Sequence, residues 1–229
     1  MNELFNLDDK IAIVTGASKG LGKSISIGLS KAGANIVATD ILDTKETIEE
    51  VRKYRPDSFG LKVDVSKRSD VKKMVEKTID KFDKIDILVN NAGILREGKA
   101  EKIEEKDWKD VIDINLTGQF FCAQEVGKQM IKQKQGKLIN ISSIAGIQGY
   151  AGSVSYSSSK GGVVLLTKTL AAEWGKHNIN VNAVCPGVFA TDMTEDYLES
   201  EEFLNNIKTN VPLKRYAEPE ELVGTIIYL

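Results

Sequence analysis

A tyrosine, a lysine and a serine in this sequence carry groups suited to proton transfer. Tyr156 and Lys160 lie four residues apart in Tyr-Ser-Ser-Ser-Lys, and Ser143 precedes the tyrosine by thirteen residues. If residues 154–174 form a helix, the phenol and the ammonium share one face, one turn apart. A phenol has a pKa near ~10, which a nearby cation lowers. With a serine hydroxyl bound to the substrate oxygen, these groups suit proton exchange with a secondary alcohol. For the pair alone, the alternative is a solvated helix surface.

A glycine-rich turn near the start of the chain has the features of a nucleotide site. The apolar run 10–14 predicts a buried strand, residues 15–22 follow the pattern Thr-Gly-x-x-x-Gly-x-Gly, and a helical pattern continues over 23–32. Glycines let a backbone approach a pyrophosphate, and a helix N-terminus favours its charge. The next apolar run, 36–38, ends at Asp40, near the position where a carboxylate binds the ribose hydroxyls of NAD. The alternative is a tight strand-to-helix turn without a ligand.

Six motifs in a fixed order extend this pattern along the chain: Thr15-Gly16-x-x-x-Gly20-x-Gly22, Asn90-Asn91-Ala92-Gly93, Asn115, Ser143, Tyr156-x-x-x-Lys160 and Pro186-Gly187. Together they resemble the classical short-chain dehydrogenase/reductase family, from about residue 7 to the end of the chain. The resemblance implies a catalytic tetrad of Asn115, Ser143, Tyr156 and Lys160. Tyr156 would be the general acid/base, and Ser143 would polarise the substrate oxygen. Lys160 would bind the nicotinamide ribose and lower the tyrosine pKa, and Asn115 would hold a water in a proton relay.

The same resemblance implies a cofactor cleft made of segments that are far apart in the sequence. The glycines would border the pyrophosphate, Asp64 would meet the adenine, and the segment from Pro186 would touch the nicotinamide. The expected cofactor-binding residues are Gly16, Ser18, Lys19, Gly20, Leu21, Gly22, Asp40, Asp64, Val65, Asn91, Ala92, Gly93, Tyr156, Lys160, Pro186, Gly187, Val188 and Thr191.

Alternating apolar runs and helical patterns predict the fold. Strands are expected at 10–15, 35–39, 59–63, 85–89, 137–141 and 179–184. Helices are expected at 21–32, 44–54, 67–82, 104–115 running on toward 133, 154–176, 194–209 and 218–228. This alternation predicts an α/β protein with a doubly wound parallel sheet, a Rossmann fold, in one catalytic domain over residues 1–229. The polar motifs follow strand ends, where ligands bind in such sheets.

The composition is typical of an enzyme that folds without disulfide cross-links and outside a membrane. The 229 residues are 41% hydrophobic and carry a net charge of −2, which argues against a nucleic-acid partner. Two cysteines, Cys122 and Cys185, suggest a reducing compartment, and we expect a cytoplasmic protein. His177 is the lone histidine, and no metal-site spacing occurs, so no metal is expected. The sequence has neither a signal-peptide pattern nor an apolar run of the ~18–20 residues that a membrane helix needs.

The sequence departs from the resemblance at its end. Chains of the family usually continue past a helix like 218–228 into a further strand and a short tail, whereas this sequence stops at Leu229. That tail commonly helps to form the tetramer in the family. Residues 163–166 place four apolar side chains around a whole helix circumference, so we expect pairing of the helices at 104–133 and 154–176 in a homo-oligomer, a dimer or a tetramer. Cover by the loop 188–216 within one subunit is the alternative.

The cofactor is expected to be NAD, with NADP possible. Asp40 stands where a 2'-phosphate would have to lie, and like charges repel. No arginine follows it, since the next residues are Ile41 and Leu42. Lys19, in the glycine turn, argues for NADP, because relatives that use NADP often carry a basic residue there.

The expected function is hydride transfer between a nicotinamide cofactor and a small secondary alcohol or ketone. One option is a sugar, sugar-acid or polyol dehydrogenase, and the other is a 3-oxoacyl-(acyl-carrier-protein) reductase. A carrier-linked substrate predicts a basic docking patch near the cleft. A third hypothesis, from another class, is a non-catalytic NAD-binding sensor or scaffold, because a fold does not fix a function. The loop 188–216 is expected to cover the substrate, and such loops vary freely.

Overall fold

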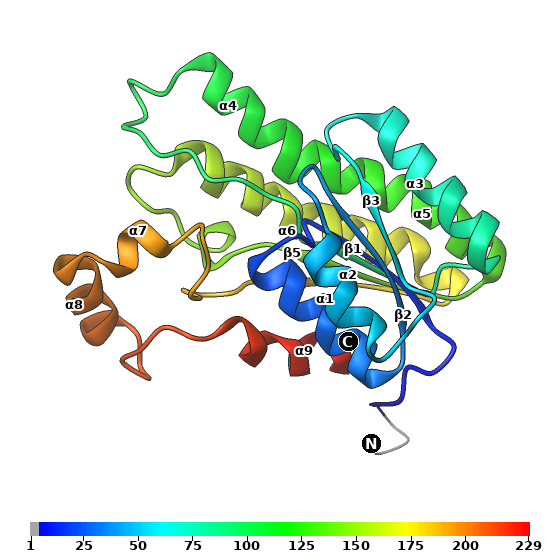
Figure 1. Cartoon of the computed structure of the whole chain (residues 1–229). Helices are drawn as coiled ribbons and strands as arrows, with labels where there is room; N and C mark the ends of the chain where they lie inside the picture. Colours follow the sequence, from blue (N-terminus) through cyan, green and yellow to red (C-terminus); the bar gives the residue numbers. More distant parts are fainter. Residues whose placement is uncertain (1–4) are drawn as a thin grey trace.

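A parallel sheet forms the centre of the molecule. The computed structural model describes residues 5–229, in which six strands pair in the order β3-β2-β1-β4-β5-β6 (Figure 1). The strands are β1 (Ile11–Thr15), β2 (Asn35–Asp40), β3 (Phe59–Lys62), β4 (Ile87–Asn90), β5 (Gly136–Ile141) and β6 (Ile179–Val184). The predicted doubly wound sheet is confirmed, and each strand begins and ends within about two residues of its predicted bounds.

The inner strands are apolar throughout because helices cover both faces of the sheet. Every residue of β1 and of β4 is buried. Within β1, Ala12 and Val14 belong to one core and Ile13 to the other, as the twofold repeat of a strand requires. At the edge of the sheet, β3 alternates instead: Phe59 and Leu61 are partly buried, whereas Lys62 is exposed.

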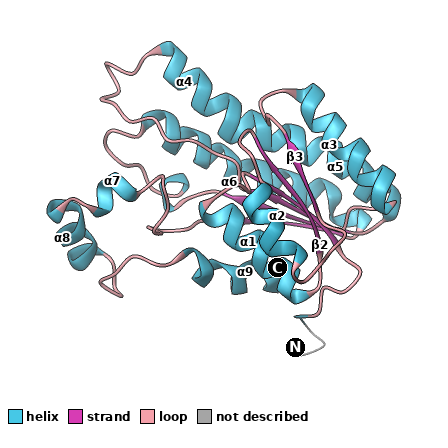
Figure 2. Ribbon diagram, in the orientation of Figure 1, coloured by secondary structure: helices cyan, strands magenta, loops and turns pink. Residues whose placement is uncertain are grey.

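Two layers of helices enclose the sheet (Figure 2). One core is closed by α1 (Gly20–Ala32), α2 (Lys45–Arg52) and α9 (Val223–Tyr228). The other is closed by α3 (Arg68–Phe82), α5 (Gly118–Gln133) and α6 (Val154–Trp174). Gly33, with φ of 120°, ends α1 as predicted, and its N–H bonds to carbonyls of the last turn.

The helix predicted to run from 104 toward 133 is helical throughout 105–133, but it contains a wider π turn that the sequence does not predict. α4 (Glu105–Ile112) leads into a π-helical turn over Asp113–Thr117, and α5 begins after it. The wider turn contains Asn115, which is fully buried. Such turns are rare and are frequent at functional sites.

A lid segment, residues 188–216, follows β6 and leaves the layered body of the molecule. It contains α7 (Glu195–Leu198) and α8 (Glu201–Asn210), two helices where the sequence predicts one helical stretch, and both lie apart from the sheet at the left of Figure 1. Its base is anchored by Ala217, which donates to the Val188 carbonyl (3.0 Å) and accepts from Ala190 (2.9 Å). The described chain then enters a 3-10 turn (Pro219–Leu222) and α9.

Candidate active site

One cavity collects most of the predicted site residues at the carboxyl ends of the strands. Its volume is about 370 Å³, and it is lined by residues from the glycine turn, the ends of β2, β3, β4 and β5, α6 and the lid segment. Of the predicted residues, all but Gly22, Asn115 and Val188 line it. Parallel strands end at one edge of the sheet, which is why segments so far apart in sequence converge.

The glycines make the close packing of the turn possible. Gly16 has φ of +65°, and a Cβ there would lie 2.8 Å from the Ala92 Cα. A Cβ on Gly22 would lie 2.0 Å from the Gly16 carbonyl oxygen, so Gly22 supports the turn from behind without lining the cavity. Asn91 ties the turn to β4, because its side-chain amide donates to the carbonyls of Thr15 and Gly16, each at 3.0 Å.

The turn fits the pyrophosphate of a dinucleotide. α1 begins at Gly20 after Lys19, and no side chain caps its free N–H groups. Gly20, with φ of +54°, has only the Thr191 side chain within 4 Å of a would-be Cβ, so the backbone is open to the cavity. An uncapped helix N-terminus behind glycines is a favourable site for phosphate.

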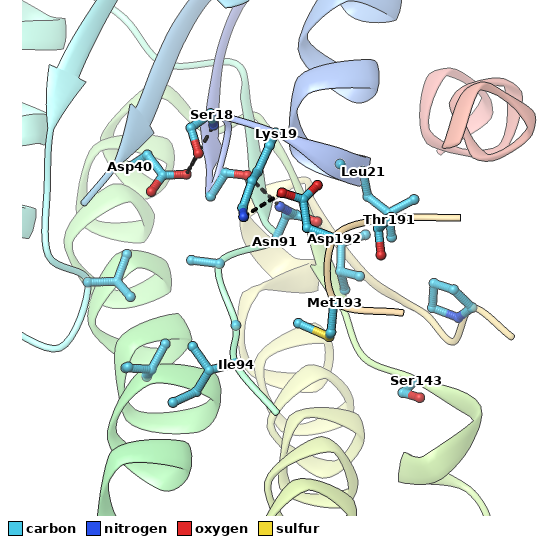
Figure 3. A pocket seen from close by; sticks show the side chains of 18 of the residues that line it. Ser18, Lys19, Leu21, Asp40, Asn91, Ile94, Ser143, Thr191, Asp192 and Met193 are labelled. Atoms are coloured by element: carbon cyan, nitrogen blue, oxygen red, sulfur yellow. Dashed lines mark hydrogen bonds and ion pairs between the residues drawn. The ribbon is translucent and has the colours of Figure 1, made fainter. Parts of the chain in front are cut away.

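Asp40 ends β2 at the wall of this cavity and is held by the turn itself. One carboxylate oxygen accepts from both the backbone N–H (3.0 Å) and the hydroxyl (2.7 Å) of Ser18 (Figure 3). The other accepts from the Leu42 N–H at 3.0 Å. The carboxylate is therefore fixed in place beside the predicted ribose site, with lone pairs that remain available to a hydroxyl.

Lys160 is a buried cation. It lies in α6, where only 3% of its surface is exposed, and its ammonium donates to the Ile141 carbonyl at the end of β5 (2.9 Å). Burial lowers the pKa of Lys160 to about 8, while the neighbouring Cys185 acts in the opposite direction. The nitrogen is 5.5 Å from the centre of the Tyr156 ring, so the predicted pairing on one helix face is confirmed.

The predicted lowering of the Tyr156 pKa is wrong for this structure. Burial raises the pKa of Tyr156, and the hydrogen bond with Ser143 opposes this only in part. The reason is that the Lys160 ammonium points to the Ile141 carbonyl and not to the phenol oxygen. Ser143 lies beside Tyr156 as predicted, and its hydroxyl also accepts from the Ala145 N–H at 3.1 Å.

Asn115 braces the site from behind. Its side-chain oxygen accepts from the Ile94 N–H (2.8 Å), and its amide donates to the Ile94 carbonyl (2.9 Å) and to the Ser159 hydroxyl (3.1 Å). The side chain thus clamps the segment after β4 against α6. Its predicted role in holding a water stays a prediction.

The lid segment supplies cavity residues that the sequence did not single out. Asp192 forms an ion pair with Lys19 of the glycine turn, at 2.6 Å, and Met193 lines the cavity beside Asp192 (Figure 3). Ile94, from the segment after β4, lines it as well. The remaining unpredicted lining residues are Ile41, Leu42, Val63, Ile114, Ile141, Ser142, Phe189 and Thr194. Five of these eight, Ile41, Val63, Ile114, Ser142 and Phe189, are next to a predicted residue in the sequence, and that adjacency is the signal that could have found them.

Other reactive side chains lie outside this cavity. Cys122 is fully buried, burial raises the pKa of its thiol to about 12, and neither cysteine is in a disulfide. His177, in the 3-10 turn Gly175–His177 after α6, does not line the cavity. Within residues 5–229, no group of three or more His, Cys, Asp or Glu is placed to bind a metal. None of the helices described is both long and apolar enough to cross a bilayer.

The chain is similar to known proteins along nearly its whole length. A family model described as "short chain dehydrogenase" matches residues 10–202. The chain is 42% identical over 226 residues to the 2-dehydro-3-deoxy-D-gluconate 5-dehydrogenase of Dickeya dadantii, with 98% of this chain and 89% of that protein covered. It is also 42% identical over 226 residues to a 3-oxoacyl-(acyl-carrier-protein) reductase of Synechocystis, with 97% and 90% covered. A solved gluconate 5-dehydrogenase of Burkholderia cenocepacia, in complex with NADP and tartrate, matches with a TM-score of 0.93 and 32% identity, covering 99% and 90%.

Proposed function

The chain belongs to the short-chain dehydrogenases, and on that premise we propose that Tyr156, Ser143 and Lys160 carry the proton-transfer half of its reaction. The reaction itself is an oxidoreduction between a secondary alcohol and a ketone with a nicotinamide cofactor. The observation that carries the proposal is the meeting of three side chains in one cavity: the Tyr156 hydroxyl lies beside the Ser143 hydroxyl, and the buried Lys160 ammonium lies 5.5 Å from the centre of the Tyr156 ring.

Each side chain has a defined task. Ser143 donates to the substrate oxygen and orients it toward Tyr156. In the oxidation direction, the Tyr156 oxygen takes the hydroxyl proton of the alcohol, and in reduction it returns a proton to the carbonyl oxygen. Lys160 is ammonium below its pKa of about 8, and it would bind the nicotinamide ribose.

The cofactor-binding residues are those of the predicted list, and we propose NAD as the preferred cofactor. When bound, the nicotinamide accepts or supplies the hydride. The uncapped N-terminus of α1 would hold the pyrophosphate, and Asp40 would accept from the ribose hydroxyls. The carboxylate of Asp40 supports NAD because it opposes a 2'-phosphate. Against this, the related gluconate 5-dehydrogenase was solved with NADP.

We propose a small hydroxylated substrate, a sugar, sugar acid or polyol. The Dickeya dadantii relative is named for a sugar acid and the Synechocystis relative for an acyl-carrier substrate, and the two are equally identical to this chain. The lid segment carries six acids against three bases, Lys208, Lys214 and Arg215. This negative balance favours the small substrate, since a carrier-linked substrate predicts a basic docking patch. The lid side chains from 192 to 202 include six exposed acids and no base: Asp192, Glu195, Asp196, Glu199, Glu201 and Glu202.

The wider setting of the enzyme is part of the same proposal. We propose one catalytic domain that acts in the cytoplasm as a homo-oligomer, a dimer or tetramer, with neither nucleic acid nor a membrane as a partner. The support for assembly comes from α6, which carries apolar residues on more than one face. One of them, Leu165, is 65% exposed. Light scattering that gives a single 25.2 kDa species for this chain would contradict the oligomer.

Turnover of the Tyr156→Phe variant tests the proposal. Only the hydroxyl is lost, so we expect kcat to fall by about 10²–10⁴-fold while cofactor affinity is retained. The matched control is Tyr54→Phe, because Tyr54 is exposed and does not line the cavity. A panel of polyols, sugar acids and acyl thioesters, each assayed with NAD and NADP through nicotinamide absorbance, identifies the substrate class. More than a tenth of the normal kcat in Tyr156→Phe would exclude the assignment, and a wild-type protein that binds cofactor but turns over nothing would favour a sensor.

A further inference from the structure

An ion pair joins the glycine turn to the lid segment at the cofactor cavity. The Lys19 ammonium lies 2.6 Å from a carboxylate oxygen of Asp192, and the two residues are 173 positions apart in the chain. Lys19 belongs to the glycine turn and Asp192 to the lid segment, and both line the cavity (Figure 3). The two side chains are 56% and 51% exposed, so the pair is accessible to a ligand and to salt.

The lid backbone aims Asp192 at this position. The Thr194 hydroxyl accepts from the Thr191 N–H (3.0 Å) and donates to the Phe189 carbonyl (2.5 Å), which closes a tight turn around Asp192. The Thr191 methyl lies 3.4 Å from where a Cβ of Gly20 would stand, so this turn rests on the start of α1. The hydrogen bond from Lys19 lowers the pKa of Asp192, and the carboxylate is therefore ionised at neutral pH.

The Asp192 carboxylate neutralises the charge of the Lys19 ammonium at a place where charge affects the choice between NAD and NADP. Lys19 is the basic side chain at the glycine turn, next to the helix N-terminus that fits a pyrophosphate. A dinucleotide with an additional phosphate gains more from a free cation there than one without it, and it also loses more to a nearby carboxylate. The identity of residue 192 thus bears on the discrimination between the two cofactors, independently of Asp40.

We propose that Asp192 is a specificity-determining residue: by pairing with Lys19 it disfavours NADP relative to NAD, and it holds the lid segment against the glycine turn while no cofactor is bound. The first half rests on the proposed nicotinamide cofactor, and the second half does not. An anionic cofactor competes with Asp192 for Lys19, so cofactor binding is coupled to release of the lid segment from the glycine turn. Because the pair is exposed, the effect is modest and depends on salt.

Cofactor titrations of four variants test the first half. Calorimetric Kd values for NAD and NADP are measured at low salt with Asp192→Asn, Lys19→Met, the double variant and the control Glu195→Gln. Glu195 is an exposed acid of the same lid segment, outside the cavity lining. We expect Asp192→Asn to tighten NADP relative to NAD by about threefold to tenfold, the size of a single partly screened charge. The shift should vanish in the Lys19→Met background, shrink at 0.5 M salt and be absent in Glu195→Gln.

Two results would overturn this half. One is a Kd ratio in Asp192→Asn that stays within twofold of the wild-type ratio. The other is an equal shift of the Kd ratio with and without Lys19, because the charge of Asp192 would then act on the cofactor directly and not through the ion pair.

Amide hydrogen exchange without any cofactor tests the second half. Asp192→Asn and Lys19→Met should each speed exchange at Thr191 and Thr194, whose N–H groups are bonded within the lid turn. Salt at 0.5 M should have the same effect on the wild-type protein and little on the variants. Unchanged exchange would refute the closing role. A wild-type protein that binds neither dinucleotide would contradict the proposed function instead, and the exchange experiment would still decide whether the pair holds the lid segment.

Discussion

Replacing the buried Lys160 by methionine should stabilise the protein while it removes a proposed catalytic group. Lys160 is 3% exposed, and its ammonium has one hydrogen-bond partner among the described residues, the Ile141 carbonyl. That carbonyl also accepts from the Gln119 side chain at 3.2 Å, so it keeps a donor when Lys160 is replaced. Methionine fills a similar volume and adapts to irregular cores.

The magnitude follows from the pKa of Lys160, which burial lowers from 10.5 to about 8. A lowered lysine pKa means that the unfolded chain binds the proton more tightly, so the protonated lysine destabilises the fold at every pH below about 8. The difference of 2.5 units corresponds to about 3 kcal/mol. This penalty is relieved as the pH rises from 8 to 10.5, where the unfolded chain also loses the proton. Loss of the hydrogen bond to Ile141 costs about 1 kcal/mol, which leaves a net gain of about 2 kcal/mol at pH 7.

Thermal unfolding at several pH values measures this gain. For a domain of this size, about 2 kcal/mol raises Tm by roughly 4–8 °C. We expect Lys160→Met to show this increase at pH 7 and to lose it by about pH 10.5. Lys168→Met is the matched control, because Lys168 is exposed on the same helix. A lower Tm for Lys160→Met at pH 7, or a difference that does not change with pH, would refute the reasoning.

Three further variants probe the proposed ribose site, the glycine turn and a glycine with open space around it. Asp40→Ala should weaken NAD by about tenfold to a hundredfold and NADP by less, as measured by titration of both cofactors, because a charge-assisted hydrogen bond to ribose is lost. A wild-type preference for NADP would contradict the role given to Asp40. Gly22→Ala should lower the free energy of unfolding by about 3 kcal/mol or more in denaturant titrations, since its Cβ would lie 2.0 Å from the Gly16 carbonyl. Gly175→Ala, with open space around the Cβ and a helical φ of −53°, should be neutral or stabilising by up to about 1 kcal/mol.

The sequence predicts the strands well because burial on both faces makes them apolar without interruption. β6 begins and ends where the pattern over 179–184 places it, and β1 differs by one residue. The π turn at Asp113–Thr117 could not be predicted in the same way. Its residues continue a helical pattern, and the wider turn depends on the bonds that the Asn115 side chain makes to Ile94 and Ser159, residues distant in the sequence.

In the candidate site, too, some residues can be predicted from sequence motifs, whereas others depend on tertiary contacts. Residues named by motif, such as Gly16, Asp40 and Tyr156, line one cavity because each follows a strand end or faces one. Asp192 carries no pattern of its own, since its importance arises from a contact with Lys19 across the cleft. The direction of the Tyr156 pKa also depends on tertiary structure, because it requires knowing how deeply the ring is buried and where the lysine points.

Buried polar groups link the strand ends near the Ile141 carbonyl to which Lys160 donates. Asn90 at the end of β4 donates to Asn140 in β5 (2.9 Å), and Asn140 donates to the Thr167 hydroxyl of α6 (2.9 Å). Gln119 of α5 completes the group by bonding to the same Ile141 carbonyl as the lysine. Buried polar groups strengthen one another where the local dielectric is low. The network therefore fixes α5, α6 and two strand ends in register, and the ammonium is held at the end of β5, within one turn of Tyr156, at a cost in stability that an apolar side chain would avoid.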